Sequence, residues 1–438
     1  METRIPIATN RLAQTVRSIA ESLPIVDMHT HLYAPAFGST GDGGTREPLL
    51  RWGIDELLAY HYFVDEVFRV LGRDGLTPER FWAMPLRERA DLIWQTLFVE
   101  RPPVSEACVG LVDVLVSLGL EPREATLDGY RSWFASRSID AHVDEVMRIA
   151  NVRRIVMTNE PFSDLERPVW LNDASRLEDP RFAAVLRIDP LIEQWGHASA
   201  RLREWGFGVD ERAASASIGE VRRFLNEWIG RIKPEYLACS LSPEFCYEPE
   251  AGDPPHAAKM FDGAVIPAAI EHGLSVALMI GARRAVHPEM QLAGDGLGRG
   301  DVDQLIALAR THPDVTFLVT MLSRENQHEL CVAARKFANI VPFGCWWYLN
   351  TASQIGELTT LRFELLGTSF IPQHSDSRVL EQLVYKWKGS RAIIADCLTE
   401  RYTEAVRAGA VITEADVRAD IRRLFETNYT DLIGTGPR

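Results

Sequence analysis

The sequence lacks the features of a membrane-bound or secreted protein. No stretch approaches the roughly 20 consecutive apolar residues that a membrane-spanning helix requires. The N-terminal segment has no apolar signal-peptide core. The six cysteines are scattered and include no Cys-x-x-Cys pair, so reduced and mostly buried thiols are expected. We therefore expect a soluble cytoplasmic protein with no membrane partner.

An excess of basic residues is also absent. Lys and Arg number 47 against 61 Asp and Glu, which gives a net charge of −14. Nucleic acids and anionic membranes bind to basic faces, so both are excluded as the main partner. An anionic substrate would have to be held by local arginines that act against the overall field.

The size and composition are those of a globular protein. The chain has 438 residues, of which 46% are hydrophobic and 25% are charged. This length exceeds that of a typical single domain. It favours either two domains or one large α/β barrel that carries insertions.

Short apolar runs that end in polar residues or glycine recur along the chain. They are rich in Val, Ile and Leu, as expected of parallel strands that are buried on both faces. The eight runs are Pro24–His31, Val152–Asn159, Ala183–Asp189, Tyr236–Ser242, Ser275–Gly281, Thr316–Leu322, Ile340–Trp347 and Ser369–Asp376.

Helical patterns separate these runs from the third onward. Examples are Ile218–Arg231, Ala257–His272, Asp301–His312, Arg324–Ala338 and Ser353–Leu366. Eight strands that alternate with helices predict a (β/α)₈ TIM barrel. A doubly wound open sheet is the alternative, but no Gly-x-Gly-x-x-Gly follows the first strand.

The gap between the first two strands is too long for a simple βα unit. It contains helical patterns at Ile54–Leu71, at Glu79–Phe98 and near Glu106–Leu118. We expect an N-terminal segment with strand one (1–31), a helical insertion over one barrel end (32–151), and the remaining barrel with C-terminal helices (152–438). The insertion also offers surface for self-association into a homo-oligomer.

His29 and His31 are the strongest local signal for chemistry. They end the first strand, and residues i and i+2 of a strand point to the same face. Barrel active sites lie at the carboxyl ends of the strands, so both imidazoles should face the barrel mouth. Two imidazoles at this spacing suit a divalent metal ion, with zinc as the preferred candidate.

Asp376, at the end of the eighth strand, is the natural third ligand. Strand eight adjoins strand one in a closed barrel, so the three side chains are expected to converge. The alternative is that Asp376 only caps the following helix. Three protein ligands would leave an open position for water or substrate. Manganese, iron or cobalt would also suit such a site.

These three residues resemble the metal site of the amidohydrolase superfamily. That family carries His-x-His on strand one and Asp on strand eight of a (β/α)₈ barrel. Its hydrolytic members usually add histidines from strands five and six. Here neither of those strands contains one, and His287 and His328 lie beyond them. The departure disfavours hydrolysis and a two-metal site.

Further motifs make the chain similar to one branch of that superfamily, the uronate isomerases. The similarity runs from about residue 20 to 430, including LSRENQHEL and SFIPQHSDSRVLEQLVYKW. Each motif alone is weak, but together, in this order and spacing, they are specific. The four shorter motifs are Tyr60-His61-Tyr62, Leu186-Arg187-Ile188-Asp189, Gly344-Cys345-Trp346-Trp347 and Asp376-Ser377-Arg378.

The resemblance implies an aldose–ketose isomerase that interconverts D-glucuronate with D-fructuronate and D-galacturonate with D-tagaturonate. Such a substrate carries a carboxylate and a row of hydroxyls, which Arg187 and Arg378 at strand ends would bind. The alternative for these arginines is a structural ion pair with Asp189 or Glu325. The consecutive residues Trp346 and Trp347 are expected to face opposite ways, one of them walling the sugar site.

Isomerisation moves a proton from C2 to C1 through an enediol, which requires a base and an acid. Tyr62 and Asp376 are the candidates, and a metal and an arginine nearby are expected to lower the pKa of Tyr62. His61 would assist ring opening or bind the substrate. Arg283, Arg284 and His287 are expected to border the pocket, whereas His142 is expected at the surface.

Two other functions stay open at this point. The same barrel supports a mononuclear metal hydrolase or decarboxylase. A non-catalytic protein that binds sugar acids is the third hypothesis, because fold alone does not determine chemistry.

Overall fold

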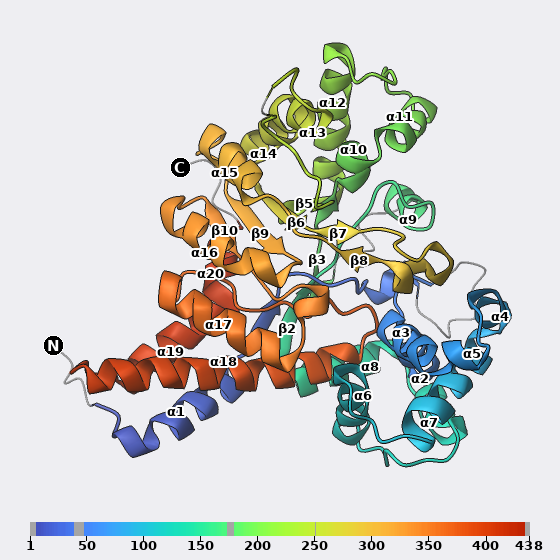
Figure 1. Cartoon of the computed structure of the whole chain (residues 1–438), viewed down its shortest axis with the longest axis vertical. Helices are drawn as coiled ribbons and strands as arrows, with labels where there is room; N and C mark the ends of the chain where they lie inside the picture. Colours follow the sequence, from blue (N-terminus) through green and yellow to red (C-terminus); the bar gives the residue numbers. More distant parts are fainter. Residues whose placement is uncertain (1–5, 39–47, 173–178, 250, 434–438) are drawn as a thin grey trace.

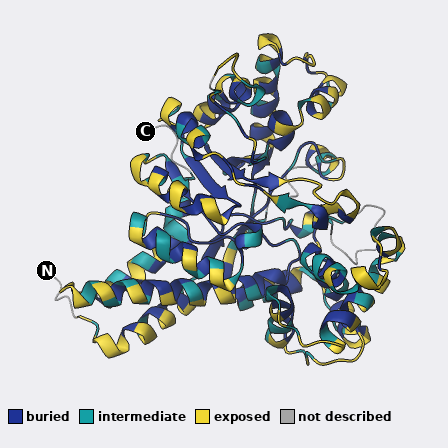
Figure 2. Cartoon of the chain, in the orientation of Figure 1, coloured by how far each residue is buried: buried dark blue, intermediate teal, exposed yellow. Residues whose placement is uncertain are grey.

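The protein is an α/β structure in which short parallel strands lie at the centre and helices surround them (Figure 1). The computed structural model describes residues 6–38, 48–172, 179–249 and 251–433. Figure 2 shows that the strands are buried, while the helices expose one face to solvent. Within these residues no helix is both long and apolar enough to cross a membrane.

The parallel strands form two groups. The first has the order β1 (Ile25–Asp27), β2 (Val152–Val156) and β3 (Phe182–Ala183). The second group has the order β10 (Ile340–Pro342), β9 (Phe317–Met321), β6 (Ser275–Ile280), β5 (Tyr236–Leu241) and β4 (Leu186–Arg187). Seven of the predicted runs therefore contain strands, and the third run is divided into β3 and β4.

Backbone hydrogen bonds join the ends of the two groups. Asn159, beyond β2, forms a parallel bridge to Leu186, and its N–H donates to the carbonyl of Val185 at 3.1 Å. On the other side, Phe343 beyond β10 forms a parallel bridge to Ile371. The N–H of Asp376 then donates to the carbonyl of His29 at 3.2 Å.

The predicted eighth strand is therefore a bridge rather than a regular strand. Ile371 is followed by Pro372, which has no N–H to continue a ladder. The segment nevertheless lies between the ends of β10 and β1, as the prediction required. A two-stranded antiparallel hairpin, β7 (Ala282–Arg283) with β8 (Gly296–Leu297), follows β6 and was not predicted.

Residues on the central strands alternate between two buried clusters. On β6, Val276, Leu278 and Ile280 pack with the surrounding helices. Ala277 and Met279 point the other way, toward a second cluster that includes inward residues of β2 and β5. Burial on both faces is typical of parallel strands that are covered by helices.

The insertion between β1 and β2 is helical, as predicted. Its helices are α2 (Ile54–Leu58), α3 (His61–Leu71), α4 (Pro78–Ala83), α5 (Leu86–Trp94), α6 (Glu106–Ser117), α7 (Asp128–Ala135) and α8 (Ile139–Ala150). The predicted helix 54–71 breaks where Tyr60 adopts an extended conformation. The helix predicted over 79–98 breaks at Met84, because the residue before a proline disfavours helical geometry.

The remaining helices cover the strands. They are α1 (Thr9–Ser22), α9 (Arg167–Asn172), α10 (Asp189–Glu193), α11 (Trp195–Glu204), α12 (Ser215–Ile232), α13 (His256–Met260), α14 (Ile266–His272), α15 (Val302–Thr311), α16 (Gln327–Lys336), α17 (Ala352–Leu366), α18 (Gln382–Arg407), α19 (Glu414–Arg422) and α20 (Asn428–Thr430). The long helix α18 packs against α1, α17, α6 and α8, and so joins the insertion to the rest of the chain (Figure 1).

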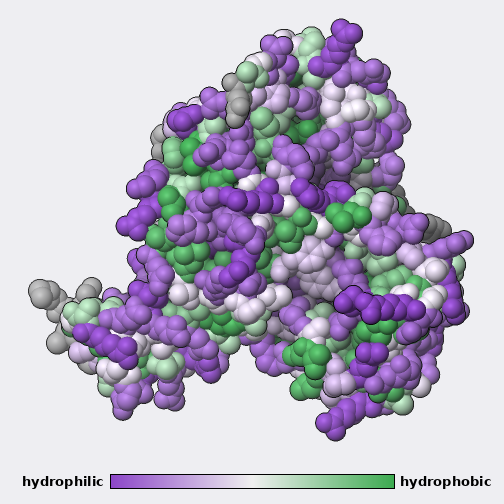
Figure 3. All heavy atoms as spheres, in the orientation of Figure 1, coloured by the Kyte–Doolittle hydropathy of each residue, from purple (hydrophilic) through white to green (hydrophobic). Residues whose placement is uncertain are grey.

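Polar residues dominate the face drawn in Figure 3, where hydrophobic residues form separate patches. All six cysteines are free, and all but Cys246 are buried. The prediction of mostly buried thiols is therefore confirmed.

Candidate active site

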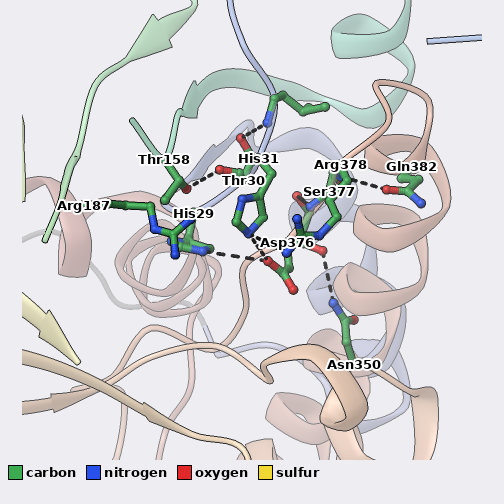
Figure 4. A network of polar contacts seen from close by, with 12 residues as sticks. His29, Thr30, His31, Thr158, Arg187, Asn350, Asp376, Ser377, Arg378 and Gln382 are labelled. Atoms are coloured by element: carbon green, nitrogen blue, oxygen red, sulfur yellow. Dashed lines mark hydrogen bonds and ion pairs between the residues drawn. The ribbon is translucent and has the colours of Figure 1, made fainter. Parts of the chain in front are cut away.

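His29, His31 and Asp376 lie together where β1 meets the segment after Ile371 (Figure 4). Nε2 of His31 lies 3.3 Å from Oδ1 of Asp376, and Nε2 of His29 lies 3.8 Å from the same oxygen. One ligand atom from each of the three residues lies within 4.8 Å of the others. The backbone supports this convergence, since Asp376 is held in the left-handed region at φ 53°.

The protonation of this cluster suits a cation. Burial lowers the pKa of His29 to about 3 and that of His31 to about 4. Burial alone would raise the pKa of Asp376, but His31 and the charge of Arg378 hold it well below its usual range. At neutral pH the site thus contains two neutral imidazoles and one carboxylate, which is the ionisation state that metal ligands require.

The hydrogen bonds also orient the imidazole lone pairs. The hydroxyl of Tyr236 donates to the carbonyl of Met28 at 2.7 Å, so its oxygen accepts from Nδ1 of His29 at 3.4 Å. Nε2 of His29 and Oδ1 of Asp376 are buried and have no hydrogen-bond partner among the described residues. A divalent cation fits these two unpartnered atoms and the neighbouring His31.

A cavity of about 140 Å³ adjoins this cluster. Its lining residues come from the ends of several strands and from the loops that follow them. They are His29, His31, Thr158, Arg187, Asp189, Ala238, Ser240, Met279, Arg284, Leu292, Trp346, Trp347 and Arg378. Met279 is the lining residue that β6 contributes.

The two predicted arginines have different surroundings. Arg187 forms a two-pronged pair with Asp189, at 3.1 and 2.8 Å, and also lies 3.3 Å from Glu160. Part of its charge is therefore balanced within the protein, as the alternative reading required. The Nη2 atom of Arg378 instead donates to Nε2 of His31 at 3.2 Å. The described residues give Arg378 no carboxylate ion-pair partner, so the alternative of an ion pair with Glu325 does not occur; Glu325 instead accepts a hydrogen bond from Ser323.

The adjacent tryptophans both line the cavity, so the prediction that they face opposite ways is wrong. Trp346 is extended, but Trp347 has φ 50° and begins a 3₁₀ turn, Trp347–Leu349. Strand alternation is lost at this point. The two indoles lie 6.1 Å apart and are both buried.

His61 and Tyr62 begin α3 of the insertion and lie next to this wall. The ring of His61 is 5.8 Å from Trp347 and 4.7 Å from Tyr62. Both ring nitrogens of His61 and the hydroxyl of Tyr62 are buried without a hydrogen-bond partner among the described residues. Burial lowers the pKa of His61 well below its usual value, so this ring is neutral.

The protein groups around Tyr62 act in the opposite sense to the metal ion that is expected to lower its pKa, so that expectation stays a prediction. Burial, together with the neighbouring Tyr60 and the charge of Asp376, raises the pKa of Tyr62 well above its usual value. Its phenol is therefore protonated at neutral pH and can donate a hydrogen bond.

His142 was also misplaced by the sequence analysis, which put it at the surface. It is fully buried, and its Nε2 lies 2.8 Å from Oε1 of Glu381. The same oxygen accepts from the N–H of Gly53 at 3.1 Å. This buried pair joins the insertion to the chain just after Arg378. A lone histidine on an amphipathic helix carries no sequence signal for such a partner.

Thr158, Ser240, Met279 and Leu292 line the cavity but were not singled out as site residues. Thr158, Ser240 and Met279 lie within predicted strands, close to their carboxyl ends, so strand position was the signal available. Leu292 belongs to the hairpin that periodicity did not indicate.

Comparison with solved structures identifies relatives across the whole chain. An uronate isomerase from Bacillus halodurans C-125 is 45% identical, with a TM-score of 0.91, over 98% of this chain and 97% of that one. This chain belongs to the uronate isomerase family. The resemblance seen in the sequence is thereby confirmed, and the match includes the helical insertion. No family model and no curated protein matches the chain.

Two more distant structures share the fold. A glucuronate isomerase from Caulobacter crescentus has a TM-score of 0.73 at 15% identity and covers 99% of this chain and 96% of its own. An uronate isomerase from Thermotoga maritima has a TM-score of 0.66 at 16% identity and covers 98% of each chain. The fold of this uronate isomerase family member is therefore shared at identities too low to carry function.

Proposed function

We propose that this protein interconverts D-glucuronate with D-fructuronate and D-galacturonate with D-tagaturonate. The observation that carries the proposal is a single cavity lined by two histidines, His29 and His31, and two arginines, Arg187 and Arg378. The carboxylate of Asp376 adjoins this cavity through its contacts with the histidines. Membership of the uronate isomerase family supports it. The sequence favours a cytoplasmic location.

The fold that presents this cavity is a closed (β/α)₈ TIM barrel in our proposal, with residues 1–31 and 152–438 forming the barrel and 32–151 the insertion. The hydrogen bonds from Asn159 to Val185 and from Asp376 to His29 join the two groups of strands. The inward cluster that includes Ala238, Ala277 and Met279 would fill the interior.

One divalent metal ion, preferably zinc, would be held by His29, His31 and Asp376. Such a donor set has three protein ligands and leaves coordination positions for substrate oxygens. The ion would supply a positive charge that polarises a sugar oxygen and orients the substrate.

The arginines and tryptophans would bind and enclose the sugar acid. Arg378 has no carboxylate ion-pair partner in the part of the chain that the structure describes, so its positive charge is available to oxygens that become negative during the reaction. Arg187 presents a guanidinium that Asp189 holds rigidly at the end of β4. Trp346 and Trp347 would wall the sugar and exclude water.

The protonation states of Asp376 and Tyr62 support the following proposed proton transfers. Asp376 is ionised and takes the proton from C2, while the electrons of that C–H bond form the C1=C2 double bond. The carbonyl oxygen at C1 takes a proton from Tyr62, which the raised pKa keeps protonated. Asp376 then returns its proton to C1, and the hydroxyl at C2 gives its proton to the Tyr62 phenolate. These two transfers complete the ketose and restore both side chains. Neutral His61 would bind a substrate oxygen or assist ring opening.

Incubation with D-glucuronate and, separately, with D-galacturonate tests the proposal. We expect a ketose whose mass equals that of the substrate, identified by NMR and mass spectrometry. A decarboxylase would release CO₂ and a hydrolase would add water, so either would change the mass. A non-catalytic sugar-acid-binding protein would give no product.

A further inference from the structure

Residues 282–297 form a hairpin that contributes to the cavity from outside the strand ends. It consists of β7, the 3₁₀ segment η6 (Pro288–Gly294) and β8. Arg284 and Leu292 of this hairpin line the 140 Å³ cavity. A second cavity of about 560 Å³ lies next to it, and Arg284 lines both.

The hairpin is held in place by two contacts from other segments and by one hydrogen bond within it. The carbonyl of Asp295 accepts from the hydroxyl of Tyr348 at 2.7 Å. The carbonyl of Glu289 accepts from the indole of Trp82 in the insertion at 2.9 Å. The side chain of Asp295 accepts from the N–H of Ala285 at 2.7 Å. Arg284 is therefore presented to the cavity by a fixed segment.

Arg284 is a half-exposed cation that lines both cavities and is paired with one carboxylate, that of Asp295. Its guanidinium is 2.6 Å from Asp295 and 5.7 Å from the ring centre of Trp347, while its side chain is 48% exposed. Asp295 is almost buried and keeps its bond to Ala285 if the guanidinium turns away. Arg187, by contrast, is fixed by Asp189 and Glu160.

Acidic side chains line the second, outer cavity of about 560 Å³. Glu160, Glu193 and Glu244 line that cavity, and the whole chain has a net charge of −14. A uronate that enters there needs a local positive charge. The adjacent Arg283 lies 3.3 Å from Glu244 and does not line the inner cavity.

We infer that Arg284 is a further substrate-binding residue, whose guanidinium contacts oxygens of the bound hexuronate at the outer end of the cavity. The inference rests on the proposed function. Binding exchanges part of the pairing with Asp295 for charge-assisted hydrogen bonds to the sugar acid. The cation–π contact with Trp347 keeps the guanidinium at the cavity when no substrate is bound.

Three variants of the metal-loaded enzyme test the inference. R284Q removes the charge, D295N removes its partner, and R299Q changes an exposed arginine paired with Glu329 outside the catalytic cavity. We expect R284Q to raise KM for D-glucuronate at least about tenfold. D295N should leave KM unchanged or lower it, and R299Q should match the unaltered enzyme.

A purely structural role predicts a different pattern. R284Q and D295N would then raise KM equally, because each breaks the same pair, and that result would overturn the inference. An unchanged KM in R284Q would also overturn it, while the proposed function stands.

Calorimetric titration with D-glucuronate separates the two proposals. If the unaltered protein binds the sugar acid without converting it, the isomerase proposal fails. At least tenfold weaker binding in R284Q would then still support the inference, and equal binding would overturn it. If the unaltered protein neither binds nor converts D-glucuronate or D-galacturonate, both proposals are overturned.

Discussion

Nε2 of His31 lies 3.3 Å from Oδ1 of Asp376, although the two residues come from the two ends of the chain. The contact exists because the segment after Ile371 lies beside β1, where the N–H of Asp376 donates to the carbonyl of His29. The proposed metal site therefore depends on the same hydrogen bonds that join the last strand segment to the first.

Replacement of Asp376 by asparagine should abolish most of the activity. D376N removes both the anionic ligand and the proposed base, so we expect kcat to fall at least about a thousandfold. Metal content, measured by elemental analysis, should fall as well. D431N, at an exposed position, is the control. Activity within tenfold of the unaltered enzyme would contradict the role of Asp376.

Replacement of Tyr62 by phenylalanine should separate activity from stability. The hydroxyl is buried without a partner, so its loss in Y62F should leave the melting temperature unchanged or higher. We expect kcat to fall about a hundredfold, because the proton donor is gone. Y402F should behave in the opposite way. The hydroxyl of Tyr402 lies outside the site and donates to the carboxylate of Asp420 at 2.7 Å. Its loss should therefore lower the melting temperature and leave kcat unchanged. Equal kcat in Y62F and the unaltered enzyme would exclude Tyr62 as the donor.

Gly344 should tolerate no side chain. Gly344 lies two residues before Trp346 and has a φ of +63°, in the left-handed region. A Cβ at this position would lie 1.8 Å from Nδ1 of His374. Gly367 has the same φ, but a Cβ would meet nothing within 4 Å. Both alanine variants should lose about 1–2 kcal/mol of unfolding free energy from backbone strain. G344A should lose clearly more and should also lose activity, because the clash displaces the tryptophan wall. Equal losses in denaturant titrations would contradict this account.

Glu166 should make stability depend on pH. Burial raises its pKa to about 7, even though Asn159, Trp170, the Glu160 N–H and Tyr33 donate hydrogen bonds to it. The ordinary value of 4.5 applies to the unfolded chain. Between pH 4.5 and 7 the folded state therefore holds more protons, and the unfolding free energy should fall as pH rises, by about 3 kcal/mol in total.

Urea titrations at pH 5, 6, 7 and 8 check this dependence. The E166Q variant lacks the titrating group, so its unfolding free energy should change less over this range than that of the unaltered protein. Identical pH dependence in the two proteins would show that Glu166 is not responsible.

Most of the central strands could be predicted from the sequence, because residues buried on both faces form continuous apolar runs. The convergence of His29, His31 and Asp376 could also be predicted, since neighbouring parallel strands end at the same edge. Periodicity could not indicate the break in the third run, nor the hairpin at 282–297, whose strands are two residues each.

The errors in the site have local causes. Trp347 leaves strand geometry through a positive φ that no pattern announces. The burial of His142 likewise follows from Glu381, a residue distant in the sequence.

Proton NMR of D-glucuronate with the purified, metal-loaded protein in D₂O tests the central claim most directly. The account predicts conversion to D-fructuronate. Deuterium at C1 of the ketose, or at C2 of recovered substrate, would show that the transferred proton exchanges with solvent. If neither D-glucuronate nor D-galacturonate is converted while metal is bound at His29, His31 and Asp376, the assignment as a hexuronate isomerase is contradicted.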